Sequence, residues 1–554
     1  MINLDESTDG LVAQVRRRGD GQDRFAIVVI LVGVTCQAYL ARGLWFFSDT
    51  WAYLLRDAST FAGLLEPNQG HLALVTILAL NAMYELVGLD YFPWFHLLRS
   101  VSYAALALSI WSYMRYRSVG PYMRWTILLI VLSLSQQSWL MAYTFANPMI
   151  HAILLASLIT VDKNPRPTPL TGLTVMTGLL IAVASGGTAI AGTAGLLAVA
   201  ISQRRWRWLG PLVVPILAYT TWFILYVARS EASGSSAGTL GSLPTELPKI
   251  VLEVLSGAIG RTLSLPPDYW PLFGSLVLVA LIWAGMRGEF SSTDSYAVLA
   301  IIAFLSMLGV ARAGTGLASL TEVRYTFNVS IWLIVLIVPT MTRLVFRRQF
   351  LVIVPLIAVV LVGNVSQLLS SMDDWERTLS YGREITETAG ALMAAGERFD
   401  PNAPIDGDRT AVLIASDVRN FLQEGWVPRA SQDERLRARA RAELKLAWST
   451  REPWRGFAPD NADELVGQGC EIVAARDVLQ THIEDARTLV VKQAEDTVVE
   501  IRWEDNEGPA LRRVDAFRGT SFVRMIDPLG GPALLEVSVT SGDSVEICNL
   551  PGIS

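Results

Sequence analysis

An aspartate among aromatic residues is the first candidate for chemistry in this chain. Asp49 lies in the segment 45–53, WFFSDTWAY, directly after an apolar run that begins near Phe25. A low-dielectric surrounding favours the neutral form of a carboxyl group and so suits a general base. An aspartate also caps helices by accepting hydrogen bonds from backbone amides. Asp49 is therefore a candidate catalytic base or a helix cap, and its neighbour Trp51 is a possible substrate-binding residue or an interfacial anchor.

Glu66 and His71 are possible substrate-binding residues a little further along. They enclose the sequence Glu66-Pro67-Asn68-Gln69-Gly70-His71, in which proline and glycine predict a turn, and His71 then begins an apolar run. The alternative is that the two side chains are a cap and a solvated surface group. No His-x-x-x-His or Cys-x-x-Cys pattern accompanies them, so the sequence predicts no metal site.

Arg324 and Tyr325 follow Glu322 and Val323 and directly precede a late apolar run. A basic residue at the outer end of a membrane helix opposes the usual positive-inside bias. An anionic lipid headgroup would explain it, because a guanidinium presents a planar fork of donors that suits phosphate. The alternative is a surface ion pair with Glu322, which contributes little.

Arg261 is a further possible substrate-binding residue, in the expected outer loop 229–269. The loop starts with the flexible stretch 233–238, SGSSAG, and continues with apolar residues at helical spacing from Leu247 to Ile259. Such a helix could lie on the membrane and close over a site, or remain a passive interfacial helix.

The composition places most of the chain in lipid. Of its 554 residues, 52% are hydrophobic and only 17% are charged, whereas about a quarter are charged in soluble domains. Charged residues become frequent after Ser370. We therefore expect a cytoplasmic segment 1–24, a membrane domain 25–369 and an extracytoplasmic domain 370–554.

Basic loops predict the topology. Twelve apolar runs approach the length of about 20 residues that a bilayer requires. If all twelve crossed, the basic loops at 115–124, 204–207 and 343–348 would fall outside, against the positive-inside rule. All three basic loops fall on the cytoplasmic side if the run 71–88, which carries Asn81 and Glu85, lies at the outer surface and does not cross the bilayer. We therefore expect about eleven transmembrane helices, a cytoplasmic N-terminus and an extracytoplasmic C-terminal domain.

The C-terminal region has the pattern of an α+β domain that ends in a small β-sandwich. A helix is expected at 433–448, and β-favouring runs at 488–493, 497–503, 521–526, 533–540 and 544–548 alternate with turn residues. Cys470 and Cys548 both fall in this region, so they are a possible disulfide in an oxidising compartment.

This layout resembles that of the GT-C glycosyltransferases, multi-spanning enzymes that use polyprenyl-phosphate or dolichyl-phosphate sugars. The resemblance rests on Asp49 after the first helix, on Gly70-His71-Leu72 in the first outer loop, and on Arg324-Tyr325. It implies transfer from a polyprenyl-phosphate sugar donor, with inversion, to a glycan, lipid or protein acceptor. Asp49 would be the base, and Arg324 and Tyr325 would bind the donor phosphate.

The sequence departs from this family at one point. Many members carry a second acid in the outer turn between the third and fourth spans, which here reads Thr144-Phe145-Ala146-Asn147-Pro148. A requirement for a divalent metal is therefore doubtful, and no cofactor is expected. The expected partners are the lipid-linked donor, the acceptor and membrane lipid, with no nucleic acid.

Other functions fit the same layout. A transporter or flippase of a lipid-linked precursor also needs many helices, but it usually places charged residues near the bilayer midplane. A polysaccharide polymerase or ligase would use a pyrophosphate-linked donor, and a sensor would bind a ligand with its outer domain.

Overall fold

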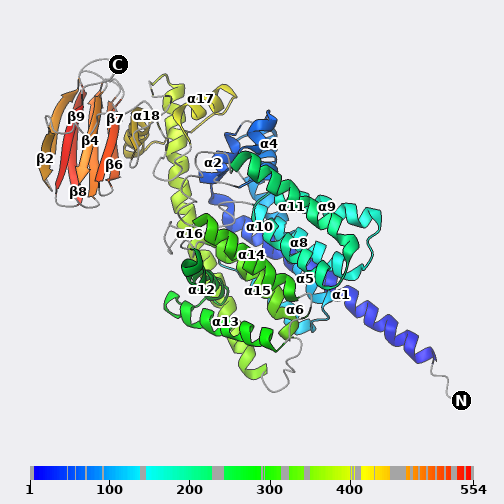
Figure 1. The fold of residues 1–554 in the computed structure, drawn as a ribbon. Helices are drawn as coiled ribbons and strands as arrows, with labels where there is room; N and C mark the ends of the chain where they lie inside the picture. Colours follow the sequence, from blue (N-terminus) through cyan, green and yellow to red (C-terminus); the bar gives the residue numbers. More distant parts are fainter. Residues whose placement is uncertain are drawn as a thin grey trace. The chain divides into compact units, whose positions relative to one another are not determined.

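A computed structural model gives the fold of the chain (Figure 1). It describes residues 5–550 except 47, 57, 69–70, 90–92, 138–144, 228–242, 288–290, 292–293, 313–322, 342–349, 398, 400, 402, 404, 406–412, 430, 450–469, 475–477, 484–486, 494–496, 506–507, 517–518, 526–532 and 542–543. At some of the described positions, Asp49 among them, only the backbone is described and not the side chain.

Helices make up most of the described chain. They are α1 Asp5–Leu40, α2 Ser48–Leu54, α3 Phe61–Leu65, α4 Leu74–Val87, α5 Pro93–Tyr116, α6 Pro121–Ser133, α8 Ala146–Lys163, α9 Pro169–Val183, α10 Thr188–Ser202, α11 Leu209–Trp222, α12 Leu243–Thr262, α13 Trp270–Met286, α14 Asp294–Arg312, α15 Val323–Met341, α16 Phe350–Ala394, α17 Ala415–Gln423 and α18 Glu434–Lys445.

The chain divides into two compact units. Unit 1 consists of Met1–Leu44, Arg56–Val87 and Tyr91–Glu376, and unit 2 of Trp45–Leu55, Gly88–Asp90 and Arg377–Ser554. Helix α16 continues through the boundary between Glu376 and Arg377, shortly after the change in composition at Ser370. The segment that carries Asp49 therefore belongs to the same unit as the C-terminal region.

Apolar helices give the chain the character of a membrane protein. By length and composition, four stretches of the described chain suffice to cross a bilayer: Gly21–Gly43, Trp206–Val227, Pro267–Met286 and Pro355–Ala394. Shorter apolar helices accompany them, and α4 is one of these, with 14 residues. At 1.5 Å per residue α4 is about 21 Å long, less than the roughly 30 Å hydrocarbon core. The count of eleven spans stays a prediction.

Proline and left-handed residues delimit several of these helices. Pro121 and Pro169 stand in the first turns of α6 and α9, where a missing N–H costs nothing. The Thr168 hydroxyl accepts the N–H of Thr171 at 3.2 Å and caps α9. Arg204, two residues after the end of α10 at Ser202, has φ +55°, so the chain turns there.

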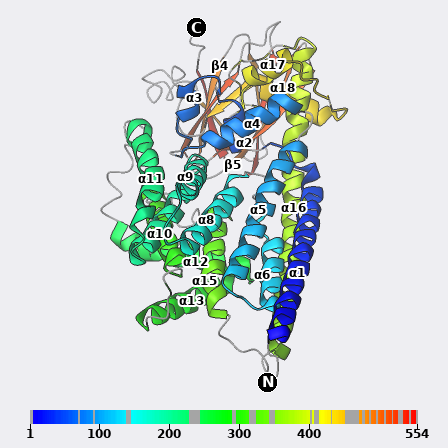
Figure 2. The ribbon, with the colours of Figure 1, turned by 90° about the vertical axis from the view of Figure 1, so that its right-hand side faces the viewer.

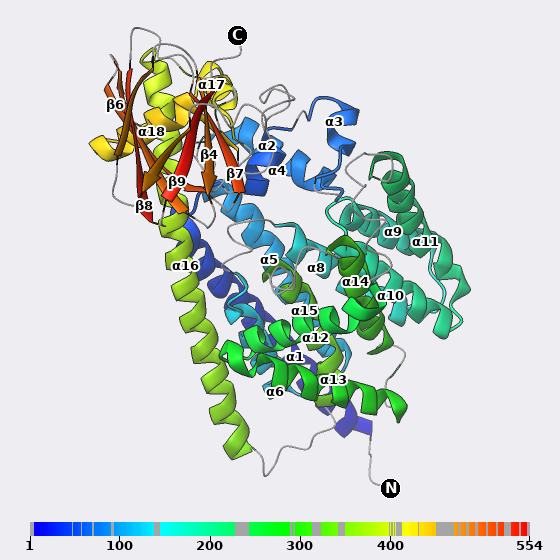
Figure 3. The ribbon, with the colours of Figure 1, turned by 60° about the vertical axis from the view of Figure 1, so that its left-hand side comes forward.

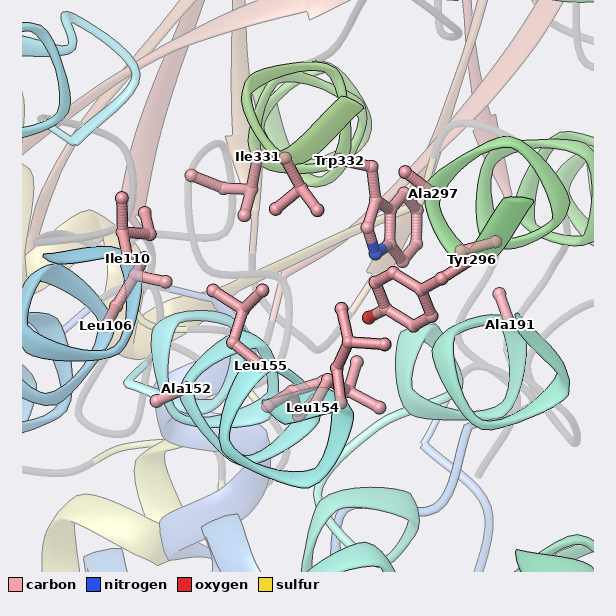
Figure 4. Close-up of a cluster of buried hydrophobic side chains, with 14 of the residues drawn as sticks. Leu106, Ile110, Ala152, Leu154, Leu155, Ala191, Tyr296, Ala297, Ile331 and Trp332 are labelled. Carbon is pink, nitrogen blue, oxygen red and sulfur yellow. The ribbon is translucent and has the colours of Figure 1, made fainter. Parts of the chain in front are cut away.

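The core of unit 1 is apolar and contains side chains from many of its helices. Figure 4 shows Tyr296 of α14 beside Trp332 of α15, with Leu154 of α8 below them. Helices α1, α5 and α6 lie side by side (Figure 2), and α12 lies against α14 and α15 (Figure 3). Helix α14 packs along α10 as well as against α15, and these contacts position both helices.

Basic residues are ion-paired at one end of unit 1. Arg117 Nη2 lies 3.4 Å from Asp294 Oδ1, and Arg205 Nη2 lies 3.5 Å from Asp162 Oδ1. Arg115 also pairs with Asp23, at the start of the first apolar run. The loops expected on the cytoplasmic side at 115–124 and 204–207 therefore lie at the same end of the unit as the beginning of that run. The loop 343–348 lies outside the described residues.

The helical part of unit 2 combines α2 with the end of α16 and with α17 and α18. The Trp51 ring lies 5.9 Å from the Phe421 ring of α17, and the Arg383 guanidinium lies 4.7 Å from the Trp45 ring centroid. The Glu397 carboxylate accepts from Arg441 Nε at 3.1 Å and from its Nη2 at 2.9 Å. Such bidentate pairs hold α18 in a defined geometry.

The strands of unit 2 form two antiparallel sheets. They are β1 Leu446–Ser449, β2 Cys470–Ala474, β3 Val478–Ile483, β4 Arg487–Gln493, β5 Thr497–Asp505, β6 Gly508–Ala516, β7 Gly519–Met525, β8 Ala533–Ser541 and β9 Ser544–Leu550. The strand orders are β1-β7-β4-β9-β2 and β3-β8-β5-β6.

Five of these strands, β4, β5, β7, β8 and β9, coincide with the runs expected from the sequence. The helix expected at 433–448 is shorter, because Leu446–Ser449 pairs with β7 as strand β1. Packing of the two sheets as a β-sandwich stays a prediction.

Candidate functional site

The first turns of α15 combine a polar sequence with burial. Thr326, Asn328 and Ser330 are at most 2% exposed, although the helix continues as an apolar run. Burying a polar group without partners is costly, and more so in lipid. These side chains therefore mark where α15 is bound to its neighbours.

Asn328 joins three helices. Its Nδ2 donates to the carbonyl oxygen of Arg324 at 2.8 Å and to Thr188 Oγ1 of α10 at 3.4 Å. Its Oδ1 accepts from His151 Nε2 of α8 at 2.8 Å. The turn that carries Arg324 is thus attached to the N-terminus of α10.

His71 lies at the same N-terminus. A Cβ at Gly187, the residue before α10, would lie 3.4 Å from His71 Nδ1 and 3.3 Å from Tyr219 Oη, so both side chains lie close to the backbone at this position. Two backbone hydrogen bonds of 2.9 Å between Asn68 and His71 close the predicted turn. The N–H of Val75, the second residue of α4, donates to the Ala184 carbonyl at 3.2 Å.

The structure therefore brings His71 and the Arg324 turn to one place, although 253 residues separate them in the sequence. The Asn328–Thr188 hydrogen bond joins the first turns of α15 to the N-terminus of α10, and each helix N-terminus carries about half a positive charge from its aligned peptide dipoles. The Arg324 guanidinium adds a full charge and lies 5.0 Å from the Tyr325 ring centroid. Together these groups favour an anionic ligand.

Arg261 lies at the end of α12. This end of α12 contacts α15 at Ser330, about two turns after the start of α15. The hydroxyl of the next residue, Thr262, donates to Ser330 Oγ at 2.9 Å, and Gln136 Nε2 donates to the same oxygen at 3.1 Å. The Arg261 guanidinium lies 5.1 Å from the Trp270 ring centroid. The contact with α15 is thus made by Thr262, at Ser330, six residues along the helix from Arg324, whereas the Arg261 guanidinium is directed to Trp270.

Glu66 has a different environment. Its carboxylate Oε2 lies 3.9 Å from Arg56 Nη1 and its side chain is 65% exposed. Arg56 also donates to the carbonyl oxygens of Glu66 and, at 3.3 Å, of Pro67. Arg56 therefore holds the backbone of the turn, and the exposed Glu66 carboxylate adds a weak surface ion pair.

Trp51 and Asp49 belong to unit 2, whereas Arg324 belongs to unit 1. Trp51 is 1% exposed and packs against Phe46 and Phe421, so aromatic packing accounts for its burial. The backbone of Asp49 is in the first turn of α2. Its side chain lies outside the described residues, so its role as a base stays a prediction.

Among the described residues, no three His, Cys, Asp or Glu side chains gather as they would around a metal ion. Cys470 and Cys548 are direct Cα partners in the antiparallel ladder of β2 and β9. Their side chains lie outside the description, so the disulfide stays a prediction that this register favours.

Sequence reasoning missed Thr188, His151 and Asn328. Each is a polar residue at or near the beginning of an apolar run, and such a residue is easily passed over as a cap. Intramembrane polar residues are nevertheless expected to have partners in neighbouring helices, which is the signal that could have found them.

Comparison with protein-family models, with curated proteins and with solved structures gives no match.

Proposed function

We propose that this protein transfers a sugar from a polyprenyl-phosphate donor to an extracytoplasmic glycan, lipid or protein acceptor, with inversion at the anomeric carbon. The observation that supports this is the meeting of two helix N-termini, those of α10 and α15, beside Arg324. A phosphate that stays attached to a lipid needs cationic groups at the end of a membrane bundle, and this arrangement supplies them.

The site lies opposite the ion-paired end of unit 1. Helix α10 runs from Thr188, at the candidate site, to Ser202, just before Arg205 and its pair with Asp162. A helix of 15 residues is about 22 Å long. This is less than the roughly 30 Å hydrocarbon core, so the length of α10 alone does not span the bilayer. If the ion-paired end faces the cytoplasm, the candidate phosphate site lies at the end of unit 1 that points toward the other side of the membrane.

The chemistry is an inverting displacement. An acceptor hydroxyl attacks the anomeric carbon from the face opposite the phosphate, a C–O bond to the acceptor forms, and the bond to the phosphate oxygen breaks. Asp49 takes the proton of the hydroxyl, and the lipid monophosphate leaves with the bonding electrons. Arg324 stabilises the charge that grows on that phosphate, as preorganised cations do in sites shielded from water.

Binding is tested first, with purified protein in detergent and a polyprenyl monophosphate as the probe. Wild type should be stabilised against thermal unfolding. Arg324→Ala should bind the lipid roughly 10-fold to 100-fold more weakly, because hydrogen bonds to charged groups contribute about 1.5–3 kcal/mol. The matched control is Arg287→Ala, another arginine stacked on an aromatic ring, 3.8 Å from the Trp283 centroid.

The outcomes separate the alternatives. Equal stabilisation of wild type and Arg324→Ala would contradict the phosphate site, and preference for a polyprenyl pyrophosphate would favour a polymerase or ligase. Asp49→Asn should retain lipid binding but lose roughly 100-fold to 10,000-fold in the rate of sugar transfer, as expected for a general base. Unchanged transfer by Asp49→Asn would exclude Asp49 as the base.

A further inference from the structure

Nearly all the hydrogen-bonding capacity of the Asn328 side-chain amide is satisfied within the protein. A side-chain amide offers two N–H donors and one carbonyl oxygen. Both donors are directed to partners, the Arg324 carbonyl on the same helix and Thr188 Oγ1 on α10, and the oxygen accepts from His151 on α8. Asn328 is 2% exposed, so water cannot readily replace any of these bonds.

The hydrogen bond between His151 and Asn328 restricts the orientation of both side chains. Because Asn328 Oδ1 can only accept, His151 must carry a hydrogen on Nε2. The imidazole is held on its flanks by edge contacts, with ring centroids 5.9 Å from Phe327 and 5.2 Å from Trp332. His151 therefore fixes the orientation of the Asn328 amide rather than following it.

The fixed amide determines the position of the Arg324 turn. The Arg324 carbonyl belongs to the first turn of α15, where carbonyl groups already accept the backbone N–H four residues on and only the first N–H groups lack intrahelical partners. The Asn328 side chain is therefore a second donor to this carbonyl. Asn328 binds that carbonyl and, through Thr188, the first residue of α10. The two helix N-termini are thus held together by one side chain.

We propose that Asn328 is the positioning residue of the anion site, which sets the Arg324 turn against the N-terminus of α10. This inference rests on the proposed function, because it assigns Asn328 to the binding of the donor phosphate. Asn328 acts through Arg324 and does not itself touch the lipid. Its loss should therefore weaken phosphate binding only while Arg324 is present.

A double-mutant cycle with a polyprenyl monophosphate tests this dependence. Asn328→Ala should weaken binding roughly tenfold, the effect expected for losing hydrogen bonds that position a charged group. In the Arg324→Ala background the same substitution should change binding by less than about twofold. An equal tenfold loss in both backgrounds would overturn the proposal.

The matched control is Asn164→Ala. Asn164 Nδ2 also donates to the carbonyl four residues earlier, that of Thr160, at 2.8 Å, but at the other end of α8. Lipid binding by Asn164→Ala should equal that of wild type. If Asn164→Ala weakened lipid binding as much as Asn328→Ala does, then removing any asparagine that bonds to the carbonyl four residues earlier would have this effect. That result would contradict a specific positioning role for Asn328.

Thr188 provides a milder variant in case Asn328→Ala does not fold. Thr188→Val has nearly the same shape without the hydroxyl acceptor, and Thr188→Ser restores that acceptor. Thr188→Val should weaken binding a few-fold and Thr188→Ser should recover it, because one neutral hydrogen bond contributes modestly. Failure of Thr188→Ser to recover binding would contradict the proposal.

Amide hydrogen exchange tests the positioning without any ligand. Asn328→Ala should speed exchange in peptides that cover the first two turns of α15 and of α10, whereas Asn164→Ala should not. If no variant, wild type included, binds the lipid, the proposed function fails, and this exchange pattern still decides whether Asn328 holds the two turns. Unchanged exchange in Asn328→Ala would overturn the positioning role itself.

Discussion

The contact between α10 and α14 depends on a glycine, which gives a sharp test of the packing that places the candidate site. A Cβ at Gly195 would lie 2.7 Å from the carbonyl oxygen of Tyr296 and 3.0 Å from a carbon of its ring. Backbone cannot rotate away as a flexible side chain can. Gly192 differs, because its added Cβ would meet the end of Leu154, which can move. Gly195→Ala should therefore separate the two helices.

The expected magnitude follows from two opposing terms. Overpacking in a well-packed interior costs roughly 1–3 kcal/mol. Replacing glycine by alanine within a helix gains about 1 kcal/mol or less in conformational preference. The matched control is Gly210→Ala at the start of α11, where an added Cβ would have no neighbour within 4 Å. Gly195→Ala should lower the free energy of unfolding by up to about 2 kcal/mol, whereas Gly210→Ala should leave it equal or slightly higher.

The assay is unfolding of the purified protein in mixed micelles, followed by tryptophan fluorescence. Because α10 begins with Thr188, Gly195→Ala should also weaken binding of a polyprenyl monophosphate, and Gly210→Ala should not. A Gly195→Ala protein as stable as Gly210→Ala would refute the close approach of α10 to α14. Weakened stability with unchanged lipid binding would refute the link between this packing and the site.

Three further predictions concern topology, oxidation and pH. A cysteine placed at Ser118 should resist impermeant thiol reagents in intact cells, and rapid labelling would contradict a cytoplasmic loop there. Protein isolated without reductant should contain a peptide linked between Cys470 and Cys548. Serine at either position should remove the link and roughly 4–5 kcal/mol of stability for a loop of this length; two alkylated thiols would disprove the pair. Burial raises the pKa of Asp417, whose carboxylate accepts the N–H of Ile414 at 3.0 Å. A raised pKa means that folding favours the protonated form, so this contribution to stability is present at low pH and is lost as the pH rises through the folded value. Asp417→Asn keeps an acceptor and should flatten that dependence in hydrogen exchange of α17; an unchanged pH profile would contradict it.

Local patterns in the sequence anticipated much of the fold. Apolar runs correspond to α1, α5, α13 and α16, and alternating runs correspond to five of the strands. Such patterns reflect interactions between residues that are near in sequence, so they can be recognised without knowing the rest of the fold. The end of α18 was misjudged because Leu446–Ser449 pairs with β7, a partner about 75 residues away.

The candidate site was only partly predictable. The sequence identified Arg324 and His71 as unusual, since a late outer arginine and a histidine after a Pro-Gly turn stand out locally. The expected topology placed both on the outer side and the family resemblance grouped them, but no local pattern showed that they are neighbours. Asn328 and Thr188 make that connection, and isolated polar residues in apolar runs carry no local sign of which helix supplies their partner.

Composition and pattern already indicate that this chain is largely apolar and helical and where its charged C-terminal region begins, and they single out Arg324 as a candidate for binding an anion. Composition and periodicity decide these features because transfer into lipid depends on each segment's own side chains. Only the fold reveals that His71 and the Arg324 turn both lie near the N-terminus of α10, that Trp51 packs among aromatic rings, and that Cys470 is opposite Cys548. These placements arise from contacts between distant segments, such as the approach of α10 to α14 at Gly195, where the shape of one helix decides how near the next can lie.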